Sequence, residues 1–217
     1  MLVGHFGVAF VAKRVEPQIS LGTLVMAAML PDLLWPIFTI AGLEYKSDKS
    51  GTATNSQLLA PISHSLLMVA IWAALFAAVY FLYRYYRTHQ KFWRHSLILF
   101  MAVLSHWLLD SISHKHPLAP GTNKLFGLEL WSSLPATIVV EGGFWLLALI
   151  IYARATHSVG RAGVYAFWPV VAFLTFVWIT NIRTGAPPPE TVFGSLIFFL
   201  LLVAWAYWMN RARSWKT

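Results

Sequence analysis

Residues 92–117, FWRHSLILFMAVLSHWLLDSISHKHP, decide the fold of this chain. Their apolar part, from about 92 to 114, matches the roughly 20 residues that an α-helix needs to cross a bilayer. Arg94 lies near the start of this part, whereas one aspartate and three histidines gather toward its other end. The stretch therefore predicts a membrane-spanning helix with a polar site near one of its ends.

Composition places the whole chain in a membrane. Of its 217 residues, 58% are hydrophobic and 11% are charged, whereas about 25% of residues in soluble domains are charged. The apolar runs are too long for strands and lack their alternation, so we expect an all-α, multi-pass transmembrane bundle. The length favours a single domain over 1–217, in which 1–143 holds the polar site and 144–217 adds spans. Besides 92–114, the expected spans are 18–43, 61–86, 135–154, 162–182 and 191–210, after a short helix at 2–13.

The net charge of +8 is explained by membrane topology rather than by nucleic-acid binding. Cations cluster in alternate links between the expected spans, which predicts six spans, two cytoplasmic termini and contacts with anionic membrane lipids. The chain has no cysteine, which excludes disulfides and thiolate metal sites. Nothing in the pattern indicates an oligomeric state. The cation-rich links are 13–14, 84–94, 154–161 and 211–216.

Acids and histidines inside the expected spans are the candidates for function. An acid at the bilayer centre costs about 2.5–3.5 kcal/mol, so such a residue usually faces a partner or a cavity. We therefore expect these groups to take part in a functional site. They are Asp32, Asp110, Glu141, His5, His64 and His106.

One histidine-rich segment has the spacing of a metal site. His106, Asp110 and His114 lie at i, i+4 and i+8, which places them on one stripe of a helix. Imidazole and carboxylate groups at i and i+4 converge, and zinc accepts both. His116 precedes Pro117, where the helix is expected to unwind, so His116 can turn back toward the same site. The segment predicts one or two divalent ions, with zinc as the first choice.

Depth in the membrane brings residues of other segments to this site. Counted at about 1.5 Å per residue from the cytoplasmic cations, four polar residues reach the outer half of the membrane. The short first helix carries His5 inward, toward Asp32. The cytoplasmic half is expected to lack acids, and His95 is expected to be solvated there. The four residues are Asp32, His64, His106 and Asp110.

Four short motifs resemble a known family. In order, GHFG (4–7), LPDLLW (30–35), SHSLL (63–67) and SHWLLDSISH (105–114) resemble the membrane-bound metal-dependent hydrolase family of bacteria. That family contains the LexA-regulated YdjM-like proteins. HPLAP (116–120) and GLELWSSLPATIVVEGG (127–143) extend the resemblance to about two thirds of the chain. Membership implies an integral protein of the bacterial inner membrane.

The order of these histidines and aspartates is also similar to zinc-dependent phospholipase C, in which such residues hold metals that cleave phosphate esters. The zinc phospholipases end with a further His-x-x-x-Glu pair, which this chain lacks, because no histidine lies four residues before Glu141. The similarity therefore implies one or two ions rather than three. The ligands that it implies are His5, Asp32, His64, His106, Asp110 and His114 or His116.

The function expected from these residues is a metal-dependent membrane hydrolase. A divalent ion would activate water for attack on a phosphorus or carbonyl centre, and Glu141 would orient or deprotonate that water. His116 is a further candidate for the catalytic machinery. An outer-half site bounded by lipid suggests a lipid or lipid-linked phosphate ester as the substrate.

Three alternatives belong to other classes. A transporter of ions or protons also carries acids and histidines within the membrane, although it would spread them through the whole depth. Haem ligation by His64 and His106 is the second, and it would leave the two aspartates unexplained. The third is a non-catalytic protein in which the polar cluster fixes the packing of the helices.

Overall fold

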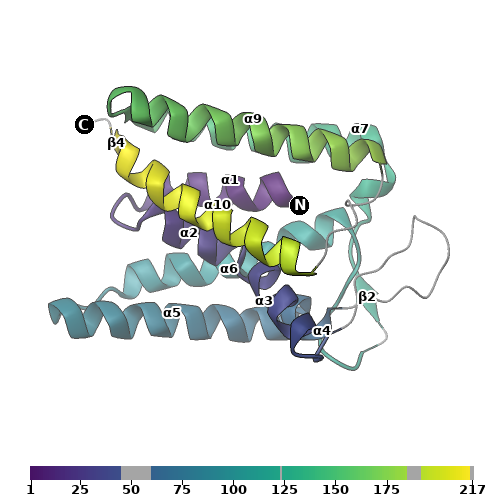
Figure 1. Ribbon diagram of the computed structural model, residues 1–217. Helices are drawn as coiled ribbons and strands as arrows, with labels where there is room; N and C mark the ends of the chain where they lie inside the picture. The colour runs from purple at the N-terminus through teal and green to yellow at the C-terminus, as the bar shows by residue number, and fades with distance from the viewer. Residues whose placement is uncertain (45–59, 123, 185–191, 216–217) are drawn as a thin grey trace.

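The computed structural model describes residues 1–44, 60–122, 124–184 and 192–215. Within these residues it confirms the expected all-α bundle (Figure 1). Five helices are long and apolar enough to cross a membrane, and one bent pair supplies a sixth span if it is counted as one. These helices expose large apolar side chains such as Val79 and Leu146, as contact with lipid chains requires.

Ten α-helices and four very short strands form the regular structure of the described ranges. The helices are α1 (Leu2–Val15), α2 (Leu21–Ala28), α3 (Leu30–Ile40), α4 (Pro61–His64), α5 (Leu66–Thr88), α6 (Trp93–Ser113), α7 (Leu134–Thr137), α8 (Gly143–Ala155), α9 (Gly160–Thr184) and α10 (Val192–Ala212). The other elements are β1 (His116–Pro117), β2 (Leu125–Phe126), β3 (Thr156–Ser158), β4 (Arg213–Trp215), a 3-10 turn η1 (Leu130–Ser132) and a π-helical turn η2 (Ile138–Gly142).

The first helix lies at the centre of the bundle. Figure 1 shows α1 and α2 between α9 on one side and α5 with α6 on the other. Helix α1 contacts α2, α6, α8 and α9, and its residues Val3, Phe6 and Phe10 are fully buried. At 14 residues it is about 21 Å long, too short to cross a bilayer core of about 30 Å. Helix α1 is therefore buried among longer helices and does not cross the membrane itself.

The span expected over 18–43 is two helices rather than one. Helix α2 ends at Ala28, α3 begins at Leu30, and the two axes are bent by 59°. Pro31 in the first turn of α3 has no N–H, so the hydrogen-bond ladder of α2 cannot continue through it. The break places Asp32 in the first turn of α3, where the helix dipole favours a carboxylate.

The segment expected to span at 61–86 also begins with a break. Pro61 starts α4, which is a single turn, and Ser65 then adopts an extended conformation before α5 resumes at Leu66. His64 ends the short turn, so its position is set independently of the long helix α5. This separation lets His64 point into the bundle from the end of the span.

Two small antiparallel sheets lie outside the long apolar runs, which form helices as expected. Strand β1 pairs with β2, with His116 opposite Phe126, and β3 pairs with β4, with His157 opposite Ser214. Each strand has only two or three residues and lies in a link outside the long helices. Such short pairs leave no trace in the hydrophobic pattern from which strands were judged.

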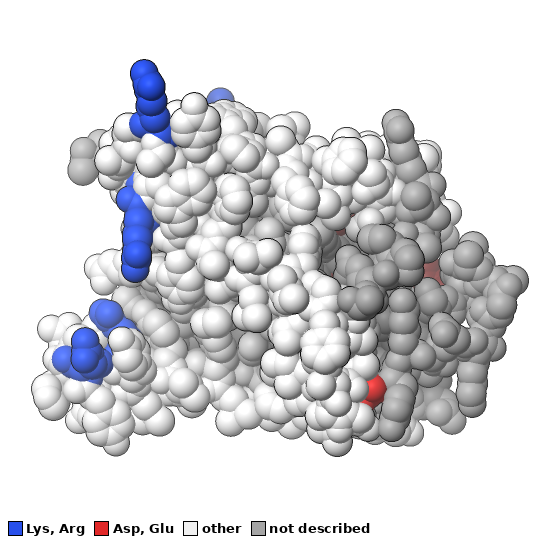
Figure 2. Space-filling view, in the orientation of Figure 1, with Lys and Arg blue, Asp and Glu red and all other residues white. Residues whose placement is uncertain are grey.

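The two ends of the bundle differ in charge. Figure 2 shows that the Lys and Arg side chains of this face gather at one end of the molecule, where β4 lies in Figure 1. Arg14, near the end of α1, lies over the ring of Trp215 in β4. Met1 is buried, and its N-terminal nitrogen donates to Asp110 Oδ1 over 2.8 Å. Helix α1 therefore runs from the polar cluster to the cationic end.

Candidate metal centre

All six residues expected as metal ligands lie together, and His116 joins them. They form three overlapping groups, and in each group the possible ligand atoms lie within 4.8 Å of one another. His106 and Asp110 each belong to two groups, so the three groups are parts of one cluster. The groups are His5, His106 and Asp110; Asp32, His64 and His106; and Asp110, His114 and His116.

Helix α6 supplies the two shared members. His106 and Asp110 are one turn apart, and His106 Nε2 lies 3.2 Å from Asp110 Oδ2. The predicted stripe does not extend to His114, because α6 ends at Ser113 and His114 is extended. The chain then turns back through β1, which brings His114 and His116 to Asp110 from outside the helix. Tertiary structure, rather than helical spacing, thus completes this group.

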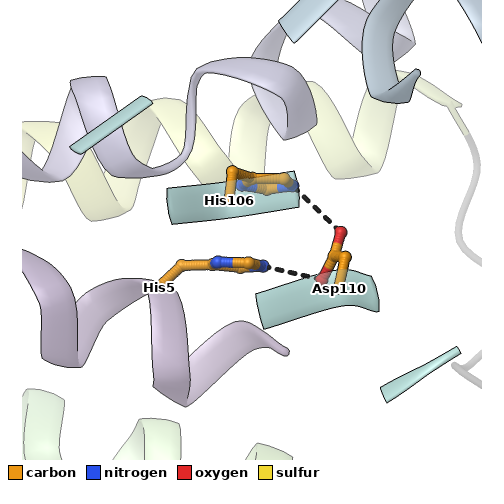
Figure 3. A group of neighbouring side chains, drawn as sticks. All are labelled: His5, His106 and Asp110. Atoms are coloured by element: carbon orange, nitrogen blue, oxygen red, sulfur yellow. Dashed lines mark hydrogen bonds and ion pairs between the residues drawn. The ribbon is translucent and has the colours of Figure 1, made fainter. Parts of the chain in front are cut away.

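Helix α1 supplies His5 at close range. The ring of His5 stacks on that of His106, with centroids 3.8 Å apart and an angle of 8° between the planes. His5 Nε2 lies 3.1 Å from Asp110 Oδ1, as Figure 3 shows. The glycines near His5 pack closely on other neighbours: a Cβ on Gly7 would lie 3.1 Å from the ring of Phe144 in α8, and one on Gly4 would lie 3.2 Å from the Cβ of Met1.

The hydrogen bonds of His106 fix where its lone pair points. Its Nδ1 lies 2.8 Å from the carbonyl oxygen of Ala28, which only accepts, so Nδ1 carries the proton. That carbonyl is available because α2 breaks there. His106 Nε2 then lies 3.2 Å from Asp110 Oδ2 and 3.8 Å from Asp32 Oδ1. In the neutral imidazole this nitrogen carries the lone pair, and imidazole with carboxylate is a donor set that suits a divalent metal ion.

His64 and Asp32 complete the second group. His64 Nε2 lies 3.4 Å from Asp32 Oδ1, and the ring centroids of His64 and His106 are 5.2 Å apart. The Asp32 side chain is 23% exposed, whereas those of His64 and His106 are 5% and 0% exposed. Asp32 therefore gives the cluster its more open side.

The link after α6 holds its histidines in the form that binds metal. Burial and, to a smaller extent, the nearby histidines lower the pKa of His116 to about 2, while Asp110 opposes the shift. His116 is therefore a neutral imidazole at pH 7, as ligation requires. Among the described residues neither of its ring nitrogens has a hydrogen-bond partner, so either one can carry the lone pair that binds a metal.

Glu141 lies beside the cluster and outside its three ligand groups. It is fully buried in the π-helical turn η2, a type of turn often found at functional sites. Its Oε2 accepts a hydrogen bond from Trp131 Nε1 at 3.2 Å, and its Oε1 has no partner within the described ranges. The ring of Trp131 in turn lies 5.0 Å from that of His114. Glu141 thus offers a free carboxylate oxygen linked to the cluster through Trp131.

The opposite end of the bundle corrects two expectations. His95 is buried in α6 rather than solvated, and its Nε2 lies 3.7 Å from Glu16 Oε1. Glu16 is also buried, so the cationic end does contain a buried acid. Arg94 reaches the same carboxylate at 3.4 Å from a largely exposed position. This pair joins the end of α1 to the start of α6.

Sequence reasoning missed two residues that contact the cluster. Glu44 and Ser63 are buried and hydrogen-bonded to each other, and Ser63 contacts His64. Glu44 lies at the end of an expected span and shows no motif spacing, since 19 positions separate it from Ser63. The one signal in the sequence was the position of Glu44, an acid that directly follows an expected span.

Comparisons with known proteins bring no relative. No protein-family model matches this chain, and no curated protein or solved structure matches it. The resemblance to the membrane-bound metal-dependent hydrolases therefore stays a prediction. The geometry of the cluster carries the argument about function.

Proposed function

We propose that this protein is a metal-dependent hydrolase that cleaves a lipid or lipid-linked phosphate ester. The observation that carries the proposal is the convergence of His106 Nε2 with carboxylate oxygens of Asp110 at 3.2 Å and Asp32 at 3.8 Å. Zinc is the ion that this mixture of imidazole and carboxylate ligands favours, with one or two ions held among the three groups. The proposed setting is the bacterial inner membrane, with the cationic end toward the cytoplasm.

The chain's own residues take distinct parts in this proposal. A bound divalent ion supplies Lewis-acid activation of water and of the phosphate ester. His106 would hold an ion together with His5 in one group or with His64 in another, and Asp110 links neighbouring groups through its two oxygens. Glu141 holds the proton that the attacking water loses, because its Oε1 is free while Trp131 fixes its Oε2.

The surroundings of Asp32 support a lipid as the substrate. Asp32 lies in the first turn of α3, and the same helix exposes Ile37 and Ile40 on its surface. A substrate that reaches Asp32 along α3 therefore meets apolar side chains before it meets the polar cluster. A lipid chain can contact those side chains while its phosphate reaches the ligands.

Replacing His106 with alanine tests the metal centre. We expect the purified wild-type protein to contain at least one zinc ion per chain by elemental analysis and the His106→Ala variant to lose it, because His106 belongs to two groups. His157→Ala is the matched control, since His157 is exposed in β3. Unchanged helicity by circular dichroism would show that the variant is folded. A wild-type protein that takes up no zinc or manganese after reconstitution would exclude a metal-dependent hydrolase.

Replacing Glu141 with glutamine separates catalysis from binding. The amide keeps the size of the side chain but cannot take up a proton, so we expect hydrolysis to fall by about 10²–10⁴-fold. Zinc content should stay unchanged, because Glu141 is outside the three ligand groups. The measurement is turnover of bis(p-nitrophenyl) phosphate and of dispersed phospholipid, with Glu129→Gln as an exposed control. Equal turnover by wild type and Glu141→Gln would rule out the role of Glu141 as the base.

Proton transport is the second candidate function, and the buried pair of Glu16 and His95 is the observation that favours it. The pair and the metal cluster lie at opposite ends of α1. Between them α1 buries Phe6, Ala9 and Phe10, whose side chains have no titratable group. These side chains offer no path for a proton along α1, which favours hydrolysis over proton transport. Proton flux into proteoliposomes that is lost in Glu16→Gln would reverse this preference.

A further inference from the structure

The carboxylate of Glu44 is buried against the turn that carries His64. Only 2% of Glu44 is exposed. Its Oε1 accepts hydrogen bonds from the backbone nitrogens of Ile62 and Ser63 at 2.6 and 2.7 Å. Its Oε2 accepts a hydrogen bond from Ser63 Oγ at 2.8 Å. Glu44 therefore ties the start of α4 to the end of α3 with both of its oxygens.

The hydroxyl of Ser63 passes this constraint to His64. Ser63 Oγ lies 2.7 Å from His64 Nδ1. A hydroxyl has one proton, and the carboxylate of Glu44 can only accept, so Ser63 donates to Glu44 and accepts from His64. The proton of the neutral imidazole is therefore on Nδ1. Its lone pair is on Nε2, which is the nitrogen that lies 3.4 Å from Asp32 Oδ1.

We infer that Glu44 is a positioning residue of the metal centre, which acts through Ser63 to make His64 Nε2 the metal-binding atom. The inference rests on the proposed metal centre and adds a residue outside its ligand groups. Histidines that bind metals usually donate their other N–H to a carboxylate or carbonyl, which fixes ring and tautomer. His106 obtains the same constraint from the backbone carbonyl of Ala28, which a substitution cannot remove. At His64 the constraint comes from side chains, so substitution can test it there.

Glu44→Gln reverses this chain of donors while it preserves the shape of the side chain. The amide oxygen must remain on the two backbone N–H groups, because those groups only donate. The amide NH₂ then faces Ser63 Oγ and donates to it, which leaves the Ser63 proton free to be donated to His64 Nδ1. This donation stabilises the tautomer that carries its proton on Nε2, where the proton blocks the metal. If Glu44 only held α4 in place, zinc affinity would be unchanged in this variant, because glutamine keeps the oxygen that accepts from Ile62 and Ser63.

Zinc affinity, measured by competition with a chelating dye, is the first readout. We expect Glu44→Gln to raise the zinc dissociation constant by about 10–100-fold. Ser63→Ala should raise it less, because His64 is then free to place its proton on either nitrogen. The double variant should bind zinc better than Glu44→Gln alone, since the misplaced donor proton is gone. Glu129→Gln is the control, because its exposed ion pair with Lys115 lies outside the cluster.

The second readout is the ¹⁵N spectrum of histidine-labelled, zinc-loaded protein, with His64 assigned from a His64→Gln variant. We expect a protonated Nδ1 and a zinc-bound Nε2 for His64 in the wild type, and loss of this signature in Glu44→Gln. Equal zinc affinity and equal His64 spectra in the two proteins would overturn the role of Glu44 alone. A wild-type protein that binds no zinc would overturn the proposed metal centre and this role together.

Discussion

Asp110→Asn is expected to abolish both zinc binding and hydrolysis. Asp110 belongs to two of the three ligand groups, and its two oxygens face different partners. Oδ1 lies 3.1 Å from His5 Nε2, and Oδ2 lies 3.2 Å from His106 Nε2. An asparagine keeps one acceptor and replaces the other with an NH₂ group, which points hydrogens at a site built for a cation. Zinc per chain, by elemental analysis, should fall to the background of the preparation.

The substitution should also change stability. Asp110 Oδ1 also lies 2.8 Å from the buried N-terminal ammonium of Met1. Removing one partner of a buried ion pair costs about 3–5 kcal/mol, because the other partner is left without its counter-charge. We therefore expect a lower unfolding temperature in detergent, even for the metal-free protein. Glu129→Gln, which removes an acid that is 49% exposed, should leave both measurements unchanged. If Asp110→Asn bound zinc with wild-type stoichiometry and affinity, Asp110 would not be a ligand.

Gly127→Ala is expected to disrupt the link that carries His114 and His116. A Cβ on Gly127 would overlap the carbonyl oxygen of His114 and lie 2.9 Å from the Cα of Lys115. Both neighbours are backbone atoms, so the segment around Gly127 and the segment around His114 must move apart. The adjacent Leu128 N–H, which donates to the carbonyl of Ser111 at 2.7 Å, would be displaced with it. Overpacking of this kind costs about 1–3 kcal/mol.

The measurement for Gly127→Ala is thermal unfolding together with zinc affinity. We expect both to fall, because the moved segment contains two members of the group around Asp110. Gly143→Ala is the matched control: a Cβ there meets nothing within 4 Å, and the residue begins helix α8. That control should be neutral or stabilising by up to about 1 kcal/mol. Equal behaviour of the two variants would show that the link tolerates movement and does not position the histidines.

The hydrophobic pattern of the sequence was sufficient to predict the membrane-spanning helices. Apolar runs of about 20 residues and cations at their ends are properties of neighbouring positions, and the five long helices follow them to within a few residues. The same runs singled out the ligand candidates, because an acid or histidine is conspicuous among apolar neighbours. His106 and Asp110 could even be paired from their spacing, since one helical turn separates them.

The arrangement of the site depends on contacts that spacing does not encode. The bond from His106 Nδ1 to Ala28 joins residues 78 positions apart and exists because Pro31 breaks the preceding helix. The path from Glu44 to His64 crosses the link between two spans. The sequence by itself determined a membrane-helical chain and the chemical identity of its polar residues, because both follow from local composition. Only the tertiary structure shows which nitrogen of His64 and of His106 faces the cluster, because the tautomer depends on the acceptor that the fold brings to the other nitrogen.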